Sequence, residues 1–221
     1  MKPYQWLIIF VILIVAVLSS YYFFFVQQTN DQTDSITSQK PNSSTTAATP
    51  SITTSPKEEN YLYEPVEEFE ERITLKPFGI YITPESSPVQ PERFAGYHTG
   101  VDVEFTDRED KTPVYAIADG TVITSQTVSG YGGLTVIRHE IDGVNIDTIY
   151  AHLDPSSLPR KGSEVAAGEV IGHLGEGNTE ETDFERKHLH FAMHKDNELD
   201  LRGYVQTEAE LSDWYNPLSY F

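Results

Sequence analysis

The chain has 221 residues, of which 34 are Asp or Glu and 15 are Lys or Arg, so its formal net charge is −19. This charge argues against a nucleic-acid phosphate backbone or an anionic lipid surface as the main partner. The length favours one domain with tethering segments over two full-sized domains. The absence of cysteine excludes disulfides, thiolate zinc sites and a lipid-modified N-terminal cysteine.

Residues 1–26 are predicted to form an N-terminal transmembrane signal-anchor. The stretch from Trp6 to Val26 is apolar except for Ser19 and Ser20, and about 20 such residues span a bilayer as a helix. Lys2 precedes the stretch, and the next basic residue is Lys40. The positive-inside rule therefore predicts a single-pass protein of the cell membrane, with the rest of the chain extracytoplasmic.

A cleaved signal peptide is the alternative, because Val17 and Ser19 could form a small-residue cleavage site. The apolar run continues beyond that site through the aromatic residues 21–25, which resemble an interfacial aromatic belt. We therefore favour an uncleaved anchor.

Two segments of different composition follow the predicted anchor. Residues 27–57 consist mainly of Ser, Thr, Gln, Asn and Pro and predict a disordered stalk, since they cannot bury enough apolar surface to offset their ordering entropy. Residues 58–72 form an acidic lead-in with several aromatic residues. Its charges favour a solvated face, although a short helix or strand packed on the domain is also compatible with its sequence.

The pattern in residues 73–221 is one of short strands separated by glycine-rich turns, which is typical of an antiparallel sandwich or barrel. One helix is expected near the C-terminus, where Thr207 and Glu210 have the spacing of a capping box. The expected strands are residues 73–82, 100–105, 114–118, 120–126, 134–139, 147–152, 170–174 and 189–194.

Two stretches, residues 112–123 and 162–175, place glycine and small residues between paired β-branched residues. Lipoyl and biotinyl carrier domains use hairpins of this kind, but they display a lysine at the tip. Neither stretch has a lysine there, so we reject a carrier function.

Four histidines and one aspartate have spacings that suit a hydrolytic zinc site. They are His98 and Asp102 in HTGVD, His152 in YAHL, and His188 and His190 in HLHF. Side chains two apart on a strand point to the same face, so the last two histidines can share one site. Zinc held by imidazole and carboxylate keeps an open position and can lower the pKa of a bound water to about 7.

These motifs, together with GEVIG and the terminal NPLSYF, occur in the order seen in LytM/lysostaphin-type zinc endopeptidases, and residues 73–221 resemble that family. The resemblance implies that His98, Asp102 and His190 bind zinc, that His152 and His188 are catalytic, and that the substrate is a peptide bond of peptidoglycan. One catalytic histidine would take or orient the proton of a zinc-activated water and the other would stabilise the oxyanion, and the sequence leaves their order open. The expected fold is all-β, a sandwich or barrel of the duplicated hybrid motif type with a minor helix.

Other polar and aromatic residues near the motifs have simpler interpretations. His139, His173 and His194 are expected to be packed or surface residues, with a supporting role at the metal site as the alternative for His194. Glu104 is expected on a solvated strand face. The same core or surface interpretation is preferred over a position in the cleft for Tyr97, Phe105 and Tyr131.

The chain departs from the family pattern in the loop 176–187, EGNTEETDFERK, and at Ala192, where glutamate is usual. We expect these changes at the rim of the cleft, away from the metal, where they would affect substrate choice. Two further functions stay open: a non-catalytic module of the same fold that binds wall or division partners, and a peptidase of secreted proteins. Retention of all five site residues favours the enzyme.

Overall fold

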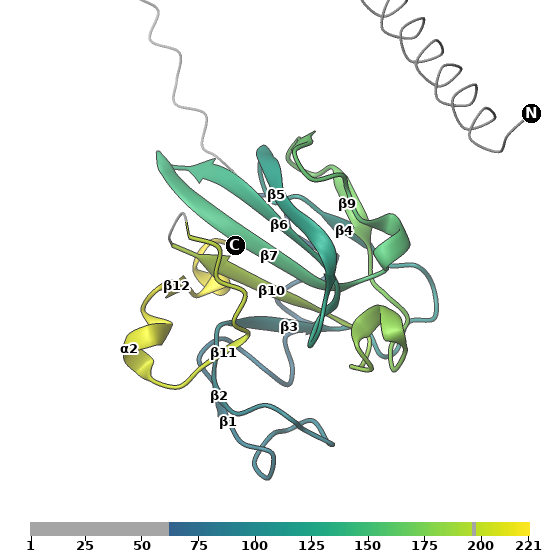
Figure 1. The fold of residues 1–221 in the computed structure, drawn as a ribbon, viewed down its shortest axis with the longest axis vertical. Coiled ribbons are helices and arrows are strands. Elements are labelled where there is room, and N and C mark those ends of the chain that lie inside the picture. Colours follow the sequence, from purple (N-terminus) through teal and green to yellow (C-terminus); the bar gives the residue numbers. More distant parts are fainter. Residues whose placement is uncertain (1–61, 196–197) are drawn as a thin grey trace, which may run out of the picture. The chain divides into compact units, whose positions relative to one another are not determined.

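The computed structural model describes residues 62–195 and 198–221 (Figure 1). The predicted anchor (1–26), the predicted stalk (27–57) and the first four residues of the acidic lead-in lie outside these ranges. Within the described ranges, no helix combines the length and hydrophobicity needed to cross a membrane.

Antiparallel β-strands make up most of the regular secondary structure in the described residues, as the sequence predicted. The largest sheet has the strand order β12-β10-β7-β6-β5-β8, and β3 pairs with the same edge of β10 as β12. Two small sheets, β1-β2-β11 and β4-β9, accompany it. The strands are β1 (Tyr81–Ile82), β2 (Gly96–His98), β3 (Gly100–Glu104), β4 (Pro113–Tyr115), β5 (Gly120–Val128), β6 (Gly132–Ile141), β7 (Val144–Leu153), β8 (Glu164–Val165), β9 (Val170–His173), β10 (His188–His194), β11 (Tyr204–Val205) and β12 (Trp214–Tyr215).

The helical content is small. The helix α2 (Glu208–Leu211) begins with the predicted capping box, in which the Thr207 hydroxyl accepts from the Glu210 amide and the Glu210 carboxylate accepts from the Thr207 amide. Three short 3₁₀ helices, η1 (Pro155–Ser157), η2 (Glu180–Thr182) and η3 (Pro217–Ser219), complete the described elements.

The large sheet is buried on both faces, which explains why its central strands carry long apolar runs. On one face, Tyr150 and Phe191 pack in a core shared with the β4–β9 ribbon and with Phe69 of the lead-in. On the other face, Ile149 and Ala192 belong to a second cluster, together with Trp214. The polar site described below shares this second face of β10.

The expected strand at 73–82 is wrong over 73–80, because only Tyr81–Ile82 forms a strand. The segment still runs beside β3, since the amides of Asp102 and Glu104 donate to carbonyls of Lys76 and Arg72. Pro77 has no N–H to continue this pairing, and Gly79 turns the chain with a φ of 76°.

The lead-in packs on the domain through its apolar residues while most of its acids stay in solvent. Val66 and Phe69 are buried, whereas Glu67, Glu68 and Glu70 are exposed.

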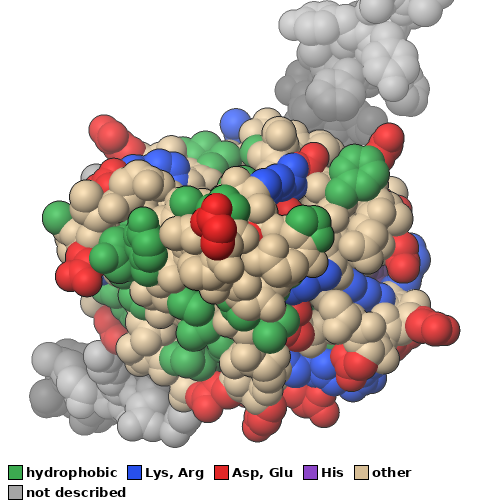
Figure 2. Space-filling model, turned by 90° about the horizontal axis from the view of Figure 1, so that it is seen from below, with side chains coloured by type: hydrophobic (Ala, Val, Ile, Leu, Met, Phe, Trp, Pro, Cys, Tyr) green, Lys and Arg blue, Asp and Glu red, His purple; other side chains and the backbone are tan. Residues whose placement is uncertain are grey.

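The face of the molecule seen in Figure 2 intersperses acidic, basic and hydrophobic side chains. Charge on that face is therefore distributed among opposite signs.

Candidate metal centre

The five predicted site residues come from four strands, and all of them except His98 line one cavity. Asp102 of β3 lies directly across the sheet from His190 of β10, and Glu104 lies across from His188. His98 ends β2, and His152 lies near the end of β7. The side chains of all five predicted site residues are buried.

His98, Asp102 and His190 form a triangle of potential metal ligands. His98 Nε2 and His190 Nδ1 are 3.1 Å apart, and they lie 3.3 Å and 3.1 Å from Asp102 Oδ1. Tetrahedral zinc bonds of about 2.0–2.1 Å place neighbouring ligand atoms about 3.3–3.4 Å apart. The donor set and its spacing therefore fit zinc.

A hydrogen bond and an aromatic contact hold the ring of His98 in this arrangement. Its Nδ1 donates to the carbonyl of Pro77 at 3.3 Å, which leaves Nε2 directed at Asp102 and His190. The ring of Tyr204, the register partner of His98, stacks on it with centroids 5.1 Å apart. Backbone and aromatic contacts thus hold this nitrogen in place.

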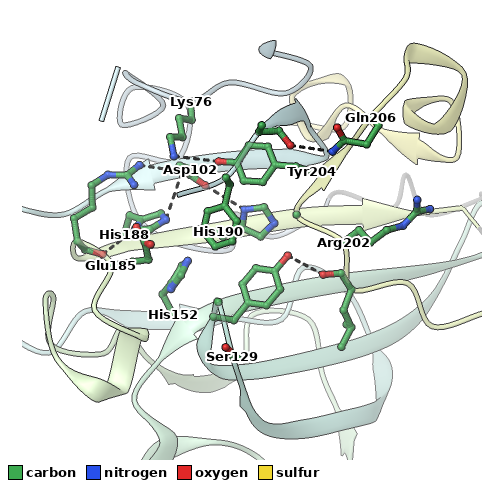
Figure 3. Close-up of a pocket in the computed structure, with 17 residues that line it drawn as sticks. Lys76, Asp102, Ser129, His152, Glu185, His188, His190, Arg202, Tyr204 and Gln206 are labelled. Carbon is green, nitrogen blue, oxygen red and sulfur yellow. Dashed lines mark hydrogen bonds and ion pairs between the residues drawn. The ribbon is translucent and has the colours of Figure 1, made fainter. Parts of the chain in front are cut away.

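His152 and His188 lie beside the triangle, with ring centroids 4.3 Å apart. Figure 3 shows both on the cavity wall with Asp102 and His190. The Nδ1 of His152 donates to the carbonyl of Thr182 (3.2 Å), and the Nδ1 of His188 donates to the carbonyl of Arg186 (2.8 Å). Each ring therefore keeps Nε2 as a proton acceptor.

Burial sets the charge states at the site. Burial lowers the pKa of His152 to about 3 and holds the pKa of His188 well below its usual range, so both imidazoles are neutral at pH 7. Burial alone would raise the pKa of Asp102. The surrounding imidazoles outweigh that effect and hold this pKa well below its usual range, so the carboxylate is ionised.

A β-bulge brings His152 into the cavity. Tyr150 and Leu153 both lie in the core of the opposite face, although strict alternation would place residues three apart on different faces, and Ala151 faces the site side. His152 is the extra residue, because Gly133 pairs with Leu153 and Leu134 with Ala151, and its φ is 63°. Such left-handed residues are strained and cluster at functional sites.

The cavity has a volume of about 340 Å³. Tyr131 lies in its wall with its ring near those of His190 and His152 (5.4 and 5.8 Å), and its hydroxyl donates to the carbonyl of Leu201. The core or surface interpretation of Tyr131 was therefore wrong. Phe105, by contrast, is a core residue, and Tyr97 packs on Tyr81 outside the cavity.

The remaining histidines lie outside the cavity lining. His139 is buried in β6, where its Nδ1 donates to the carbonyl of Asp119. His194 lies against the edge of Trp214 with centroids 4.6 Å apart, and His173 is half-buried at the end of β9.

Two expectations were wrong: the solvated position of Glu104 and the position of the loop 176–187 away from the metal site. Glu104 is buried, because Arg186 of the loop 176–187 donates to both of its carboxylate oxygens. The same guanidinium donates to Asp102 Oδ2 at 2.9 Å. The altered loop therefore contacts a potential metal ligand and is not confined to the rim. Glu104 and Arg186 are 82 residues apart, so their spacing in the sequence gives no indication that they pair.

Residues 96–201 match the model of a protein family described as Peptidase family M23. The DD-carboxypeptidase/endopeptidase Mpg of Neisseria meningitidis serogroup B is 38% identical over 78 residues, which cover 35% of this chain and 16% of that protein. Endolysin 2638A of Staphylococcus phage 2638A is 34% identical over 112 residues, which cover 50% of this chain and 22% of that protein. The chain therefore spans less than a quarter of the length of these curated relatives.

Among solved structures, LytU is similar to this chain with 27% sequence identity and a TM-score of 0.45. The match covers 67% of this chain and 83% of that one.

Proposed function

This chain carries a domain of peptidase family M23, and on that premise we propose that it is a zinc metallo-endopeptidase that hydrolyses peptide bonds of peptidoglycan stems or cross-bridges. One observation carries the proposal: two neutral imidazoles line the same cavity as Asp102 and His190, which form a buried triangle of tetrahedral spacing with His98. A purely structural histidine cluster has no need of this division between three converging ligand atoms and two neighbouring unprotonated nitrogens.

We assign the metal to His98 Nε2, Asp102 Oδ1 and His190 Nδ1. Zinc bound there would supply Lewis acidity and a water of lowered pKa. Three protein ligands leave a position for that water or for the substrate carbonyl, as catalytic zinc sites require.

His152 and His188 would carry the proton transfers. Because both keep Nε2 unprotonated, either ring can take the proton of the attacking water. The ring that gains the proton becomes an imidazolium, which can stabilise the oxyanion and then donate to the leaving amine. The order of the two histidines stays open.

The names of the relatives support a wall-peptide substrate. One is called a DD-carboxypeptidase/endopeptidase and the other an endolysin.

We propose that residues 1–26 anchor the protein in the cell membrane and that residues 27–57 tether the domain outside it. The apolar run and the basic residue before it support this placement. Immunoblotting of membrane fractions for an N-terminal tag tests it. A mature protein that begins near Tyr21 would contradict an uncleaved anchor.

Incubation of purified peptidoglycan with the full chain, with and without a chelator, tests the proposed activity. We expect new peptide termini, identified by mass spectrometry, that disappear with chelator and return with added zinc. Intact peptidoglycan under all conditions would favour the non-catalytic module. Cleavage of secreted proteins alongside intact peptidoglycan would identify a peptidase of proteins instead.

A further inference from the structure

The guanidinium of Arg186 lies in the wall of the cavity, and its side chain is 11% exposed. It donates Nε and Nη2 to the two carboxylate oxygens of Glu104, a bidentate pair that fixes the plane of the guanidinium. Nη2 also donates to Asp102 Oδ2 at 2.9 Å. One cation therefore links two buried carboxylates.

These carboxylates need a shared cation because of their position on β3. Asp102 and Glu104 are two residues apart, so both face the site side of the sheet, and both are buried. Two buried carboxylates so close together repel each other unless a positive group lies between them. Arg186 supplies that group from the loop before His188.

The contact gives the two oxygens of Asp102 different neighbours. Oδ1 lies 3.3 Å from His98 Nε2 and 3.1 Å from His190 Nδ1. Oδ2 accepts from Arg186 and also lies 3.5 Å from His188 Nε2. The guanidinium therefore contacts a different oxygen of Asp102 than the His98–His190 pair does.

We propose that Arg186, held by Glu104, is a positioning residue that orients Asp102 as a one-oxygen metal ligand. The inference deepens the proposed function and rests on it, since it assumes that His98, Asp102 and His190 bind zinc. Partners that orient metal ligands typically contribute 10–100-fold to metal affinity.

A charge-neutral double substitution, Arg186→Gln with Glu104→Gln, separates positioning from electrostatics. It removes one positive and one negative charge, so the net charge near the metal is unchanged while the support of Asp102 is lost. The matched control is Arg138→Gln with Asp147→Asn, which removes a bidentate pair between β6 and β7, outside the cavity lining.

Zinc affinity of the full chain is measured by competition with a chromophoric chelator, and the visible spectrum of the cobalt-loaded protein reports the coordination geometry. We expect the double variant to bind zinc about 10–100-fold more weakly, with an altered cobalt spectrum. The control pair should stay within about threefold of wild type, because distant pairs do not couple to the site.

Arg186→Lys provides a second test if the double variant does not fold. Lysine keeps the charge and can reach one carboxylate but cannot make the bidentate bridge, so we expect an intermediate loss of affinity. Wild-type zinc affinity and an unchanged cobalt spectrum in these Arg186 variants would overturn the inference and leave the proposed function intact. A wild-type chain that binds no zinc would overturn both.

Discussion

At the scale of single residues, Gly100 sets the distance between two of the proposed ligands. It lies between His98 and Asp102 and faces Ala192 across the β3–β10 pair. A Cβ at this position would lie 2.4 Å from the carbonyl oxygen of Phe191 and 2.9 Å from the Ala192 Cβ. Only glycine allows β3 and β10 to approach this closely. Ala192 keeps the side chain small at the same point.

Gly100→Ala should therefore both destabilise the domain and weaken zinc binding. Backbone atoms would have to move apart, and we expect a loss of about 1–3 kcal/mol in the free energy of unfolding. Gly143→Asn is a suitable control, because a Cβ there meets nothing within 4 Å and asparagine tolerates its φ of 78°. Denaturant unfolding and zinc titration of both variants measure the effect. Equal stability and zinc affinity of Gly100→Ala and wild type would contradict this account.

The sequence was sufficient to select the five residues that the structure brings together, but not to predict their geometry. Strand alternation correctly places His188 and His190 on one face. The same rule would direct His152 away from the site, and only the bulge in β7 brings it back. The Arg186–Glu104 pair depends on how the loop 176–187 folds onto β3, which no local pattern encodes.

At the scale of elements, the acidic lead-in is part of the folded core. Phe69 is fully buried, with its ring 4.8 Å from that of Phe221 and 5.7 Å from that of Phe191 on β10. It therefore packs beneath the strand that carries His188 and His190. The alternation of exposed acids with buried apolar residues explains how a strongly charged segment can pack here.

Phe69→Ala should destabilise the protein by about 3–5 kcal/mol, because it leaves a cavity in a closed core. Glu70→Ala, an exposed neighbour, should change the free energy of unfolding by less than about 0.5 kcal/mol. Denaturant unfolding compares the two. A lead-in that is only loosely attached would give equal and small effects for both substitutions.

His139 in β6 makes the stability of the fold depend on pH. Burial lowers its pKa below the usual value, although the hydrogen bond to the carbonyl of Asp119 partly opposes this effect. The folded protein keeps this imidazole neutral where the unfolded chain, with a pKa of about 6.5, takes up a proton. The stabilisation is therefore fully present above about pH 6.5 and declines as the pH falls toward the folded pKa.

Between pH 7 and pH 5, the wild-type chain should lose up to about 2 kcal/mol more stability than His139→Gln, which lacks this titration. Unfolding is measured in chelator so that metal binding does not contribute. The slopes of stability against pH are compared, since the substitution also lowers stability at every pH. Parallel slopes would show that His139 does not titrate between the folded and unfolded states.

Sequence patterns located the long strands better than the short ones. The expected strands at 120–126, 134–139, 147–152 and 189–194 coincide with β5, β6, β7 and β10, which have long alternating or apolar runs. The short strands β2, β11 and β12 have only two or three residues, too few for a periodic signal. Because β2 carries His98 and β11 carries its stacking partner Tyr204, part of the site depends on these short elements.

At the scale of the whole molecule, the chain combines a described β-domain with an N-terminal region whose anchor and stalk remain predictions. A stalk of about 30 residues would span roughly 30 Å as a coil and about 100 Å when stretched. On the proposed function, this length would let the domain reach wall peptides near the membrane. The proposed anchor would then limit where hydrolysis takes place, and the proposed metal centre would supply its chemistry.

The central claim is that three residues hold zinc while two others move protons. It is tested most directly by measuring bound zinc and peptidoglycan cleavage together in the wild-type chain, Asp102→Ala and His152→Ala. We predict that Asp102→Ala loses both zinc and cleavage, whereas His152→Ala retains one zinc per chain and cleaves at least about 100-fold more slowly. A His152→Ala chain that cleaves at the wild-type rate, or an Asp102→Ala chain that keeps its zinc, would contradict the account.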